Sequence, residues 1–241
     1  QRSLRDLRIS LTDQCNLRCR YCMPAEVFGP DYPFLKTRDL LSFDDIVQLV
    51  RVSVDLGVTK VRLTGGEPLL RPGIAELVGR ISDETLAEDV AITTNGLLLA
   101  RKARLLRDKG LDRVNLSLDG LDPGVFQAMS GGYGRVEQVL AAIDACLDCG
   151  LRLKLNCVVR RGVNDAEIPA MIRFGRERGI EVRFIEYMDV GCSNGWTRGD
   201  VFTAKEMLES ISRDVGEARP IDMPESAVAR QYELVGAGYR F

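Results

Sequence analysis

The chain has 241 residues, of which 45% are hydrophobic and 28% charged, and its formal net charge is -2. This composition is that of a globular protein and argues against disorder, and the charge gives no overall positive field to attract nucleic acid or an anionic membrane. The sequence contains no histidine, which excludes an imidazole base and zinc sites of mixed cysteine and histidine ligands from this chain.

In chain order, short β-rich runs predict six strands, over residues 7–11, 60–64, 90–94, 113–118, 153–159 and 182–186. Amphipathic stretches between them predict helices, among them 42–56, with Ser42 and Asp45 as a capping box, and 136–148. Glycines that would end helices in a left-handed cap precede four of the strands, namely Gly57, Gly110, Gly150 and Gly179. Repeated βα units predict a parallel sheet, either doubly wound or curled as part of a TIM-like barrel.

Polar motifs follow four of the predicted strands, at the ends where parallel α/β folds bind ligands. Three cysteines follow the first strand, and Gly65-Gly66-Glu67-Pro68 follows the second. Thr94-Asn95-Gly96 and Asp119 follow the third and fourth strands. We therefore expect these motifs to face the same edge of the sheet.

The three cysteines are Cys15, Cys19 and Cys22, in the spacing CxxxCxxC. Three thiolates can hold a [4Fe-4S] cluster and leave one iron without a protein ligand. A structural zinc site is the alternative, but it needs four closed ligands, so we favour the cluster. The CxxC formed by Cys146 and Cys149 lies in a predicted helix and is interpreted as core, as is Cys157.

The cysteine motif, together with the later Gly-Gly-Glu-Pro turn, resembles the signature of the radical S-adenosylmethionine (radical SAM) superfamily. Within that superfamily, the stretches at residues 6–13, 21–24, 62–68, 93–96 and 183–188 are similar to the GTP 3',8-cyclases of molybdenum cofactor biosynthesis. With this resemblance, the predicted fold class is α/β, an incomplete TIM-type (βα)6 barrel in which residues 1–241 form a single domain.

The resemblance implies that Cys15, Cys19 and Cys22 hold the cluster and that S-adenosylmethionine chelates the open iron. It implies that electron transfer cleaves the sulfonium, and that the resulting radical takes the hydrogen from C3' of GTP before that carbon closes onto C8. The residues implied to contact S-adenosylmethionine are Tyr21, Gly65, Gly66, Glu67, Ser117 and Met188. The residues implied to contact GTP are Arg8, Arg62, Thr93 and Lys154, to which the charge argument below adds Arg183.

The residues themselves support an anion site, because cationic side chains within strands must be paired or functional. Arg8, Arg62, Lys154 and Arg183 come from four different predicted strands. They could together neutralise a triphosphate. The alternative is that some of them point outward or pair with Glu67, Glu186 or Asp119.

The family also implies a second [4Fe-4S] cluster near the C-terminus, and no cysteine follows Cys192 to ligate it. We therefore expect a C-terminal segment of the full-length protein to be missing after residue 241. The resemblance implies an electron donor and a downstream pyranopterin-forming protein, and a homodimer is one assembly compatible with it. No apolar run is long enough to span a membrane and no charged-then-apolar secretory leader begins at Gln1, so the expected location is the cytoplasm.

Two alternatives remain open at this point. One is a radical SAM enzyme that modifies a peptide, since the cysteine motif and the glycine turn are shared by many such enzymes. The other is a non-catalytic module with zinc in the cysteine loop. Binding of GTP through Arg8, Arg62 and Lys154 would distinguish a GTP cyclase from a peptide-modifying enzyme. The metal content would distinguish an iron-sulfur enzyme from a zinc module.

Overall fold

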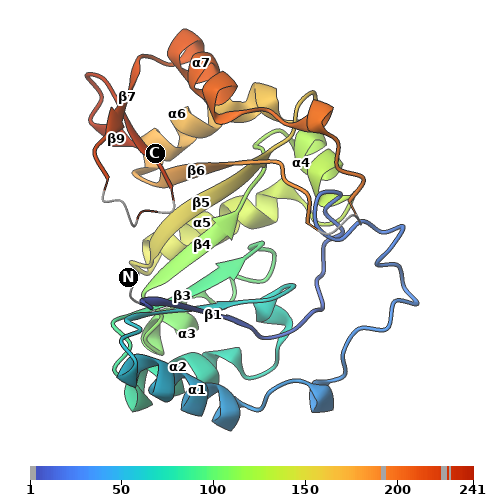
Figure 1. Cartoon of the computed structure of the whole chain (residues 1–241), viewed down its shortest axis with the longest axis vertical. Helices are drawn as coiled ribbons and strands as arrows, with labels where there is room; N and C mark the ends of the chain where they lie inside the picture. The colour runs from blue at the N-terminus through green and yellow to red at the C-terminus, as the bar shows by residue number, and fades with distance from the viewer. Residues whose placement is uncertain (1–3, 191–193, 224–226, 228) are drawn as a thin grey trace. The chain divides into compact units, whose positions relative to one another are not determined.

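The structure is a computed structural model, and it describes residues 4–190, 194–223, 227 and 229–241. Six strands form one sheet in the order of the chain (Figure 1). They are β1 (Asp6–Ser10), β2 (Lys60–Thr64), β3 (Asp89–Thr94), β4 (Arg113–Ser117), β5 (Arg152–Val159) and β6 (Glu181–Glu186). Each strand lies within one residue of its predicted bounds. The order has two ends, β1 and β6, which confirms the predicted incomplete barrel.

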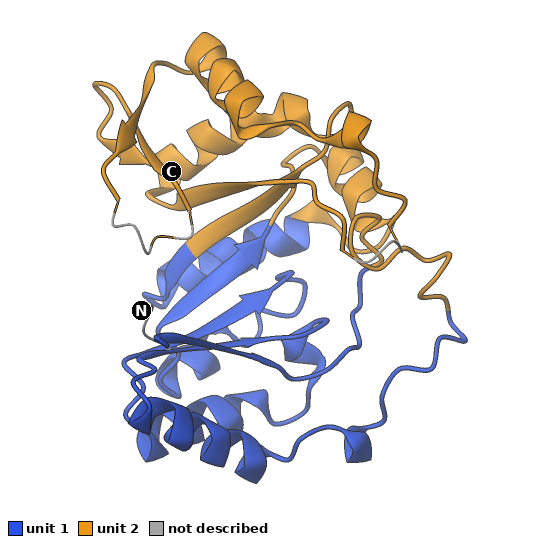
Figure 2. Cartoon of the chain, in the orientation of Figure 1, with its two compact units in different colours: residues 1–17, 30–117, 137–153 blue, residues 18–29, 118–136, 154–241 orange. Residues whose placement is uncertain are grey.

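The chain divides into two compact units, shown in blue and orange in Figure 2. Unit 1 comprises residues 1–17, 30–117 and 137–153, and unit 2 comprises residues 18–29, 118–136 and 154–241. Neither unit is a continuous stretch of chain, so each is described below by itself. The single domain expected over residues 1–241 stays a prediction.

Unit 1 carries strands β1 to β4, whose neighbouring pairs are parallel. Its helices are α1 (Phe43–Asp55), α2 (Ile74–Glu84), α3 (Ala103–Asp108) and α5 (Val136–Asp148), and its 3-10 turns are η1 (Thr37–Asp39) and η2 (Pro68–Leu70). In Figure 1, α1, α2 and α3 lie on the same side of these strands. Apolar side chains on alternate strand positions are fully buried, among them Val61, Leu63 and Ile92. The period of two in the sequence therefore places these apolar side chains on the same face of the strands.

The predicted capping box of the first helix is present. The Ser42 hydroxyl accepts a hydrogen bond from the Asp45 backbone N–H at 3.1 Å, and the Asp45 carboxylate accepts one from the Ser42 N–H at 3.1 Å. The four predicted glycine caps also adopt positive φ angles, of 102° at Gly57, 91° at Gly110, 72° at Gly150 and 67° at Gly179. Local sequence signals therefore set the ends of these helices.

Unit 2 carries most of β5, together with β6, to which β5 pairs in parallel. Its helices are α4 (Pro123–Ser130), α6 (Ile168–Arg178) and α7 (Ala204–Asp214), and its 3-10 turns are η3 (Asp165–Glu167) and η4 (Arg198–Asp200). A small antiparallel sheet, which is not among the predicted elements, is formed by β7 (Ala218–Ile221), β8 (Gln231–Leu234) and β9 (Tyr239–Arg240). The hydroxyl of Tyr239 donates to the Ile180 carbonyl at 2.7 Å and attaches this sheet to the residue before β6.

Two of the cysteines interpreted as core are buried, since Cys146 is 0% and Cys157 is 1% exposed. Cys149 is only half-buried. Burial raises the pKa of the Cys146 thiol to about 12, which keeps it protonated and unreactive at neutral pH. The CxxC formed by Cys146 and Cys149 is therefore a packing feature.

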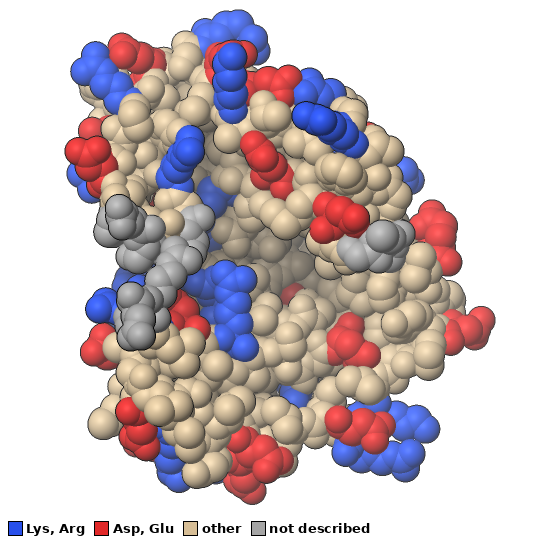
Figure 3. Space-filling model, viewed as in Figure 1, with Lys and Arg blue, Asp and Glu red and all other residues tan. Residues whose placement is uncertain are grey.

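Basic and acidic side chains are interspersed over the face of the molecule shown in Figure 3. This agrees with the nearly balanced counts of 33 Lys and Arg residues and 35 Asp and Glu residues. In the described part of the chain, none of the helices combines the length and apolar character needed to cross a membrane.

Candidate functional site

Polar side chains of unit 1 lie on the strand face opposite to Val61, Leu63 and Ile92. Arg8 of β1 and Arg62 of β2 are register partners, as are Thr93 of β3 and Asn115 of β4. Arg8 is exposed, while Arg62 and Thr93 are half-buried. Register partners share a face, so the period of two sets these predicted substrate contacts apart from the core.

The glycine turn after β2 packs directly on the segment that leads into the first cysteine. The Gly66 N–H donates to the Thr12 carbonyl at 2.7 Å, and the Glu67 N–H donates to the Gln14 carbonyl at 2.7 Å. A Cβ atom on Gly66 would lie 2.2 Å from the Gln14 oxygen, and one on Gly65 would lie 2.4 Å from the Thr12 oxygen. The glycines therefore permit two backbone segments to touch, and the N–H of Gly66 is already used within the protein.

Glu67 is 1% exposed and connects the ends of β2 and β3. Its carboxylate accepts hydrogen bonds from the Thr94 hydroxyl at 2.8 Å, the Asn95 N–H at 2.8 Å and the Leu69 N–H at 3.0 Å. Burial raises the pKa of Glu67, although these three donors lower it. Its role in unit 1 is therefore to hold two loop starts together, and its predicted contact with S-adenosylmethionine stays a prediction.

The sulfur of Cys15 receives two N–H groups within unit 1. The Leu17 backbone N–H donates to Sγ at 3.4 Å, and the Asn95 side-chain amide donates to it at 3.7 Å. The same Asn95 amide nitrogen lies 2.8 Å from the Asn16 side-chain oxygen. Hydrogen bonds to sulfur are among the features that tune iron-sulfur clusters. A half-buried thiol that receives such donors fits a thiolate ligand of a cluster.

Cys19 and Cys22 lie in unit 2 on a tight turn. The Cys19 carbonyl accepts from the N–H groups of Cys22 and Met23, both at 2.9 Å. The residue before Cys19 is held by the end of α4, since the Arg18 N–H donates to the Ser130 carbonyl at 3.2 Å. Cys19 is half-buried and Cys22 is exposed, so both thiols are accessible to a cluster.

Tyr21, between these two cysteines, is held at both ends. Its hydroxyl donates to the Asp119 carboxylate at 2.7 Å, and its carbonyl accepts from the Asn194 amide at 3.0 Å. Burial, followed by the charge of Asp119, raises the pKa of Tyr21 well above its usual value. Burial likewise raises the pKa of Asp119 to about 6, against the lowering effect of hydrogen bonds from Tyr21 and the Val158 N–H.

Lys154 of β5 and Arg183 of β6 share one acidic partner, Glu181. The Lys154 Nζ lies 2.8 Å and the Arg183 Nε 2.6 Å from Glu181 carboxylate oxygens. Burial raises the pKa of Glu181, but the hydrogen bonds from both cations outweigh this and hold the pKa below its usual value. The acidic partners expected from the sequence, Glu67, Glu186 and Asp119, do not include Glu181.

The remaining predicted contacts are dispersed among the strand ends. Ser117, the last residue of β4, is half-buried, and Met188, after β6, is 56% exposed. Their contacts with S-adenosylmethionine stay predictions.

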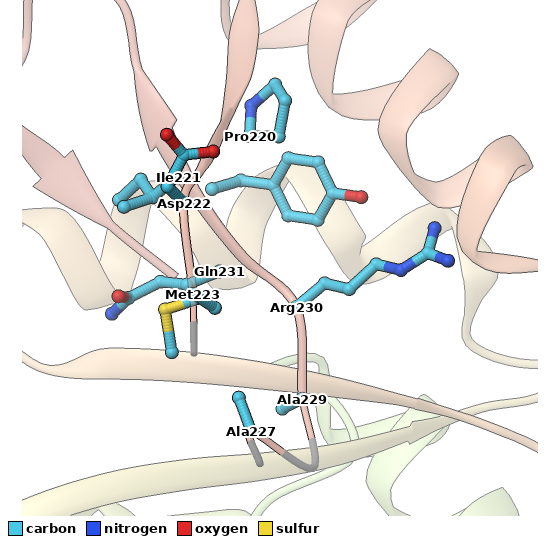
Figure 4. A pocket seen from close by; sticks show the side chains of 9 residues that line it. Pro220, Ile221, Asp222, Met223, Ala227, Ala229, Arg230 and Gln231 are labelled. Carbon is cyan, nitrogen blue, oxygen red and sulfur yellow. The ribbon is translucent and has the colours of Figure 1, made fainter. Parts of the chain in front are cut away.

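Two cavities lie in unit 2. One, of about 630 Å³, is lined by the small antiparallel sheet and its connecting segment, including Asp222, Met223 and Arg230 (Figure 4). None of the predicted site residues lines it. The other, of about 420 Å³, borders the cysteine turn and is lined by Arg20, Pro24, Glu26, Arg160, Asn194 and Gly195.

Among the described residues, no three cysteine or acidic side chains are already grouped as a metal site. The assignment of Cys15, Cys19 and Cys22 as ligands therefore stays a prediction. It rests on their spacing along one short stretch of chain and on the N–H groups directed at the Cys15 sulfur. The donor set itself, three accessible thiols, fits a cluster with one open iron.

Comparison with known proteins gives close relatives over most of the chain. The chain is 51% identical over 212 residues to a GTP 3',8-cyclase of Acidothermus cellulolyticus, covering 88% of this chain and 59% of that protein. It is 43% identical over 242 residues to a GTP 3',8-cyclase of Staphylococcus haemolyticus, covering 100% of this chain and 71% of that protein. The chain thus spans only part of the length of these relatives.

Solved structures with this fold have much lower identity. The crystal structure of Streptococcus suis SuiB bound to S-adenosylmethionine matches with a TM-score of 0.69 and 20% identity, covering 87% of this chain and 47% of that one. This likeness supports the fold alone. A sequence model described as the Radical SAM superfamily matches residues 9–175. This chain therefore belongs to the radical SAM superfamily and, within it, to the family of the GTP 3',8-cyclases.

Proposed function

We propose that this chain catalyses the radical cyclisation of GTP to (8S)-3',8-cyclo-7,8-dihydroguanosine 5'-triphosphate, the first step of molybdenum cofactor biosynthesis. The observation that carries the proposal is the 43% identity that runs over the whole chain to a GTP 3',8-cyclase. The presence of cationic side chains on four of the strands supports a substrate with a triphosphate.

Membership of the superfamily implies a [4Fe-4S] cluster and S-adenosylmethionine. We assign the cluster to Cys15, Cys19 and Cys22, and we infer that the full-length protein carries a second cluster on cysteines outside this chain. When bound and reduced, the cluster supplies the electron that cleaves S-adenosylmethionine. We assign contacts with S-adenosylmethionine to Tyr21, Gly65, Gly66, Glu67, Ser117 and Met188.

The protein's own contribution is to fix the cysteine segment and to orient the ligands. In unit 1, the glycine turn holds residues 12–14 through two backbone hydrogen bonds, immediately before Cys15. In unit 2, Asp119 and Asn194 hold Tyr21, between Cys19 and Cys22. The ligand-bearing backbone is therefore ordered by contacts that need no cluster.

We assign contacts with GTP to Arg8, Arg62 and Thr93 in unit 1 and to Lys154 and Arg183 in unit 2. In unit 2, two cations share one carboxylate, Glu181, which leaves one unit of positive charge. A phosphate group can then displace or share part of this pairing. We also propose a cytoplasmic setting, an electron donor and a protein that converts the product to a pyranopterin.

Replacing Cys19 with serine is expected to remove the cluster and all cleavage of S-adenosylmethionine, because a hydroxyl is a poor substitute for a thiolate ligand. The measurement is iron content after anaerobic reconstitution, with the electron spin resonance spectrum of the reduced protein. Wild type should hold about four irons per chain. The matched control is Cys149→Ser, a half-buried thiol outside the motif, which should keep its iron. Full iron in the Cys19 variant, or zinc in the wild type, would contradict the assignment.

Replacing Lys154 with methionine is expected to weaken GTP binding at least tenfold, because a charge-assisted hydrogen bond contributes about 1.5–3 kcal/mol. Glu181→Gln should act in the opposite direction and tighten binding severalfold, since it releases both cations from their carboxylate. The measurement is titration calorimetry with GTP. Lys205→Met, on an exposed helix position, serves as control. If all variants bind GTP like the wild type, the substrate is not a triphosphate at this site, as expected for a peptide-modifying enzyme.

A further inference from the structure

Tyr21, which is half-buried, and Asp119, which is buried, link the cysteine turn to the end of β4. The Tyr21 hydroxyl donates to one carboxylate oxygen of Asp119 at 2.7 Å. Asp119 is 7% exposed, and both residues lie in unit 2. Tyr21 is separated by one residue from Cys19 and is next to Cys22. The hydrogen bond from Tyr21 to Asp119 therefore holds the backbone that carries two of the three predicted cluster ligands.

The Asp119 side chain is held in place independently of Tyr21. Its second carboxylate oxygen accepts from the Val158 N–H of β5 at 2.9 Å. Its backbone carbonyl accepts from the Asn164 amide at 2.7 Å, and that same amide also donates to the Val158 carbonyl at 2.7 Å. Asn164 is 0% exposed. Asp119 is thus fixed to the strand framework, with one oxygen directed at the cysteine turn.

The turn itself is short and is closed by backbone bonds. The N–H groups of Cys22 and Met23 both donate to the Cys19 carbonyl. The Asn194 amide donates a hydrogen bond between neutral groups to the Tyr21 carbonyl. The Tyr21 hydroxyl, in contrast, donates to a charged acceptor, the Asp119 carboxylate. Hydrogen bonds to charged groups are stronger than those between neutral groups.

We propose that Asp119 is a positioning residue for the cluster: through the Tyr21 hydroxyl it fixes the backbone of Cys19 to Met23, and so the direction of two cluster thiolates. The proposal rests on the proposed function for the identity of the cluster. The geometric part, the ordering of the cysteine turn by Asp119, does not depend on it. Preorganised ligands release a cluster more slowly, because less order is lost when a thiolate rebinds the iron.

The first test uses the reconstituted holoprotein and the variants Tyr21→Phe, Asp119→Asn and the double variant. Asparagine keeps the size of Asp119 but removes its charge: the amide oxygen can still accept from the Val158 N–H, and the amide nitrogen can only donate to the Tyr21 hydroxyl, so the charged acceptor is lost. We expect iron release to a chelator to be about tenfold faster in each single variant. We also expect a changed spin resonance spectrum of the reduced cluster. The double variant should be no worse than either single variant, because both remove the same charge-assisted hydrogen bond.

Glu167→Gln is the matched control. Glu167 accepts from the N–H groups of Leu121 and Asp122, two and three residues after Asp119, and these bonds lie outside the cysteine turn. Glu167→Gln should therefore perturb the loop after β4 while leaving the iron release rate and the spectrum of the cluster unchanged. Equal effects of Glu167→Gln and Tyr21→Phe, or additive effects in the double variant, would overturn the proposal.

The second test uses hydrogen exchange in the cluster-free protein, so that it remains decisive if the wild type binds no cluster. The amides of Cys22 and Met23 should exchange about tenfold faster in Tyr21→Phe and Asp119→Asn than in the wild type. Unchanged exchange would overturn the proposal. Faster exchange in a protein that binds no iron would sustain the ordering of the turn and instead reject the proposed function.

Discussion

Gly66→Ala is expected to lower the free energy of unfolding by about 3 kcal/mol or more and to reduce cluster binding. The added Cβ would lie 2.2 Å from the Gln14 carbonyl oxygen and 2.8 Å from the Asp13 carbonyl oxygen. Both atoms belong to backbone that is hydrogen-bonded to the glycine turn, so neither can move without breaking a bond. The displaced segment leads directly to Cys15, and hence the loss of stability and of the cluster should appear together.

Denaturant unfolding of the cluster-free protein, with iron content after reconstitution, measures both effects. The matched control is Gly199→Ala, whose Cβ would meet only the Thr197 hydroxyl oxygen at an ordinary 3.6 Å. This control should change the free energy of unfolding by less than about 1 kcal/mol. A Gly66 variant as stable as the control would show that the turn does not pack on residues 12–14.

Glu67→Ala is expected to lower the free energy of unfolding by at least about 3 kcal/mol, because it leaves three donors without their acceptor at a cost of about 1–3 kcal/mol each. The donors are the Thr94 hydroxyl and the N–H groups of Leu69 and Asn95. Glu67→Gln should have an intermediate effect, since one oxygen is kept and the amide nitrogen faces a donor. The exposed Glu76→Ala serves as control and should change stability by less than about 1 kcal/mol.

The pH dependence of unfolding gives a further check on Glu67. Burial holds its folded-state pKa above the unfolded value. The folded state therefore binds the proton more readily, and the stabilisation from this group is present at low pH and is lost as the pH rises through the folded-state pKa. Glu67→Gln lacks this dependence. A stability difference between wild type and Glu67→Gln that does not change with pH would contradict the buried environment.

Local patterns of the sequence predicted the framework well. The strands were located within one residue because alternation and β-branched runs depend only on neighbouring residues. The capping box at Ser42 and the glycine caps could likewise be predicted, because each involves a few neighbouring residues and specifies one backbone geometry. The small sheet of β7, β8 and β9 was missed, because its short strands carry too few residues to show a period.

The sequence predicted which residues belong to the candidate site, but it did not predict their hydrogen-bond and ion-pair partners. Lys154 and Arg183 were recognised as unusual cations in strands, yet their partner Glu181 was missed because its pairing depends on the β5–β6 register, in which Lys154 lies opposite Glu181. Glu67 was expected to face a ligand, and the structure shows its carboxylate occupied by three donors of unit 1. Several acidic residues in the sequence could serve each cation, and only the fold selects one.

By itself, the sequence determined the α/β framework, the spacing of the three cysteines and the superfamily, because each is a property of residues close together along the chain. The tertiary structure decided how the glycine turn packs on residues 12–14, which donors Glu67 receives, and that Asp119 reaches Tyr21 across 98 positions of the chain. The physical reason is that hydrogen bonds and close contacts act over a few ångströms in space, and only the folded backbone brings such distant residues within that range.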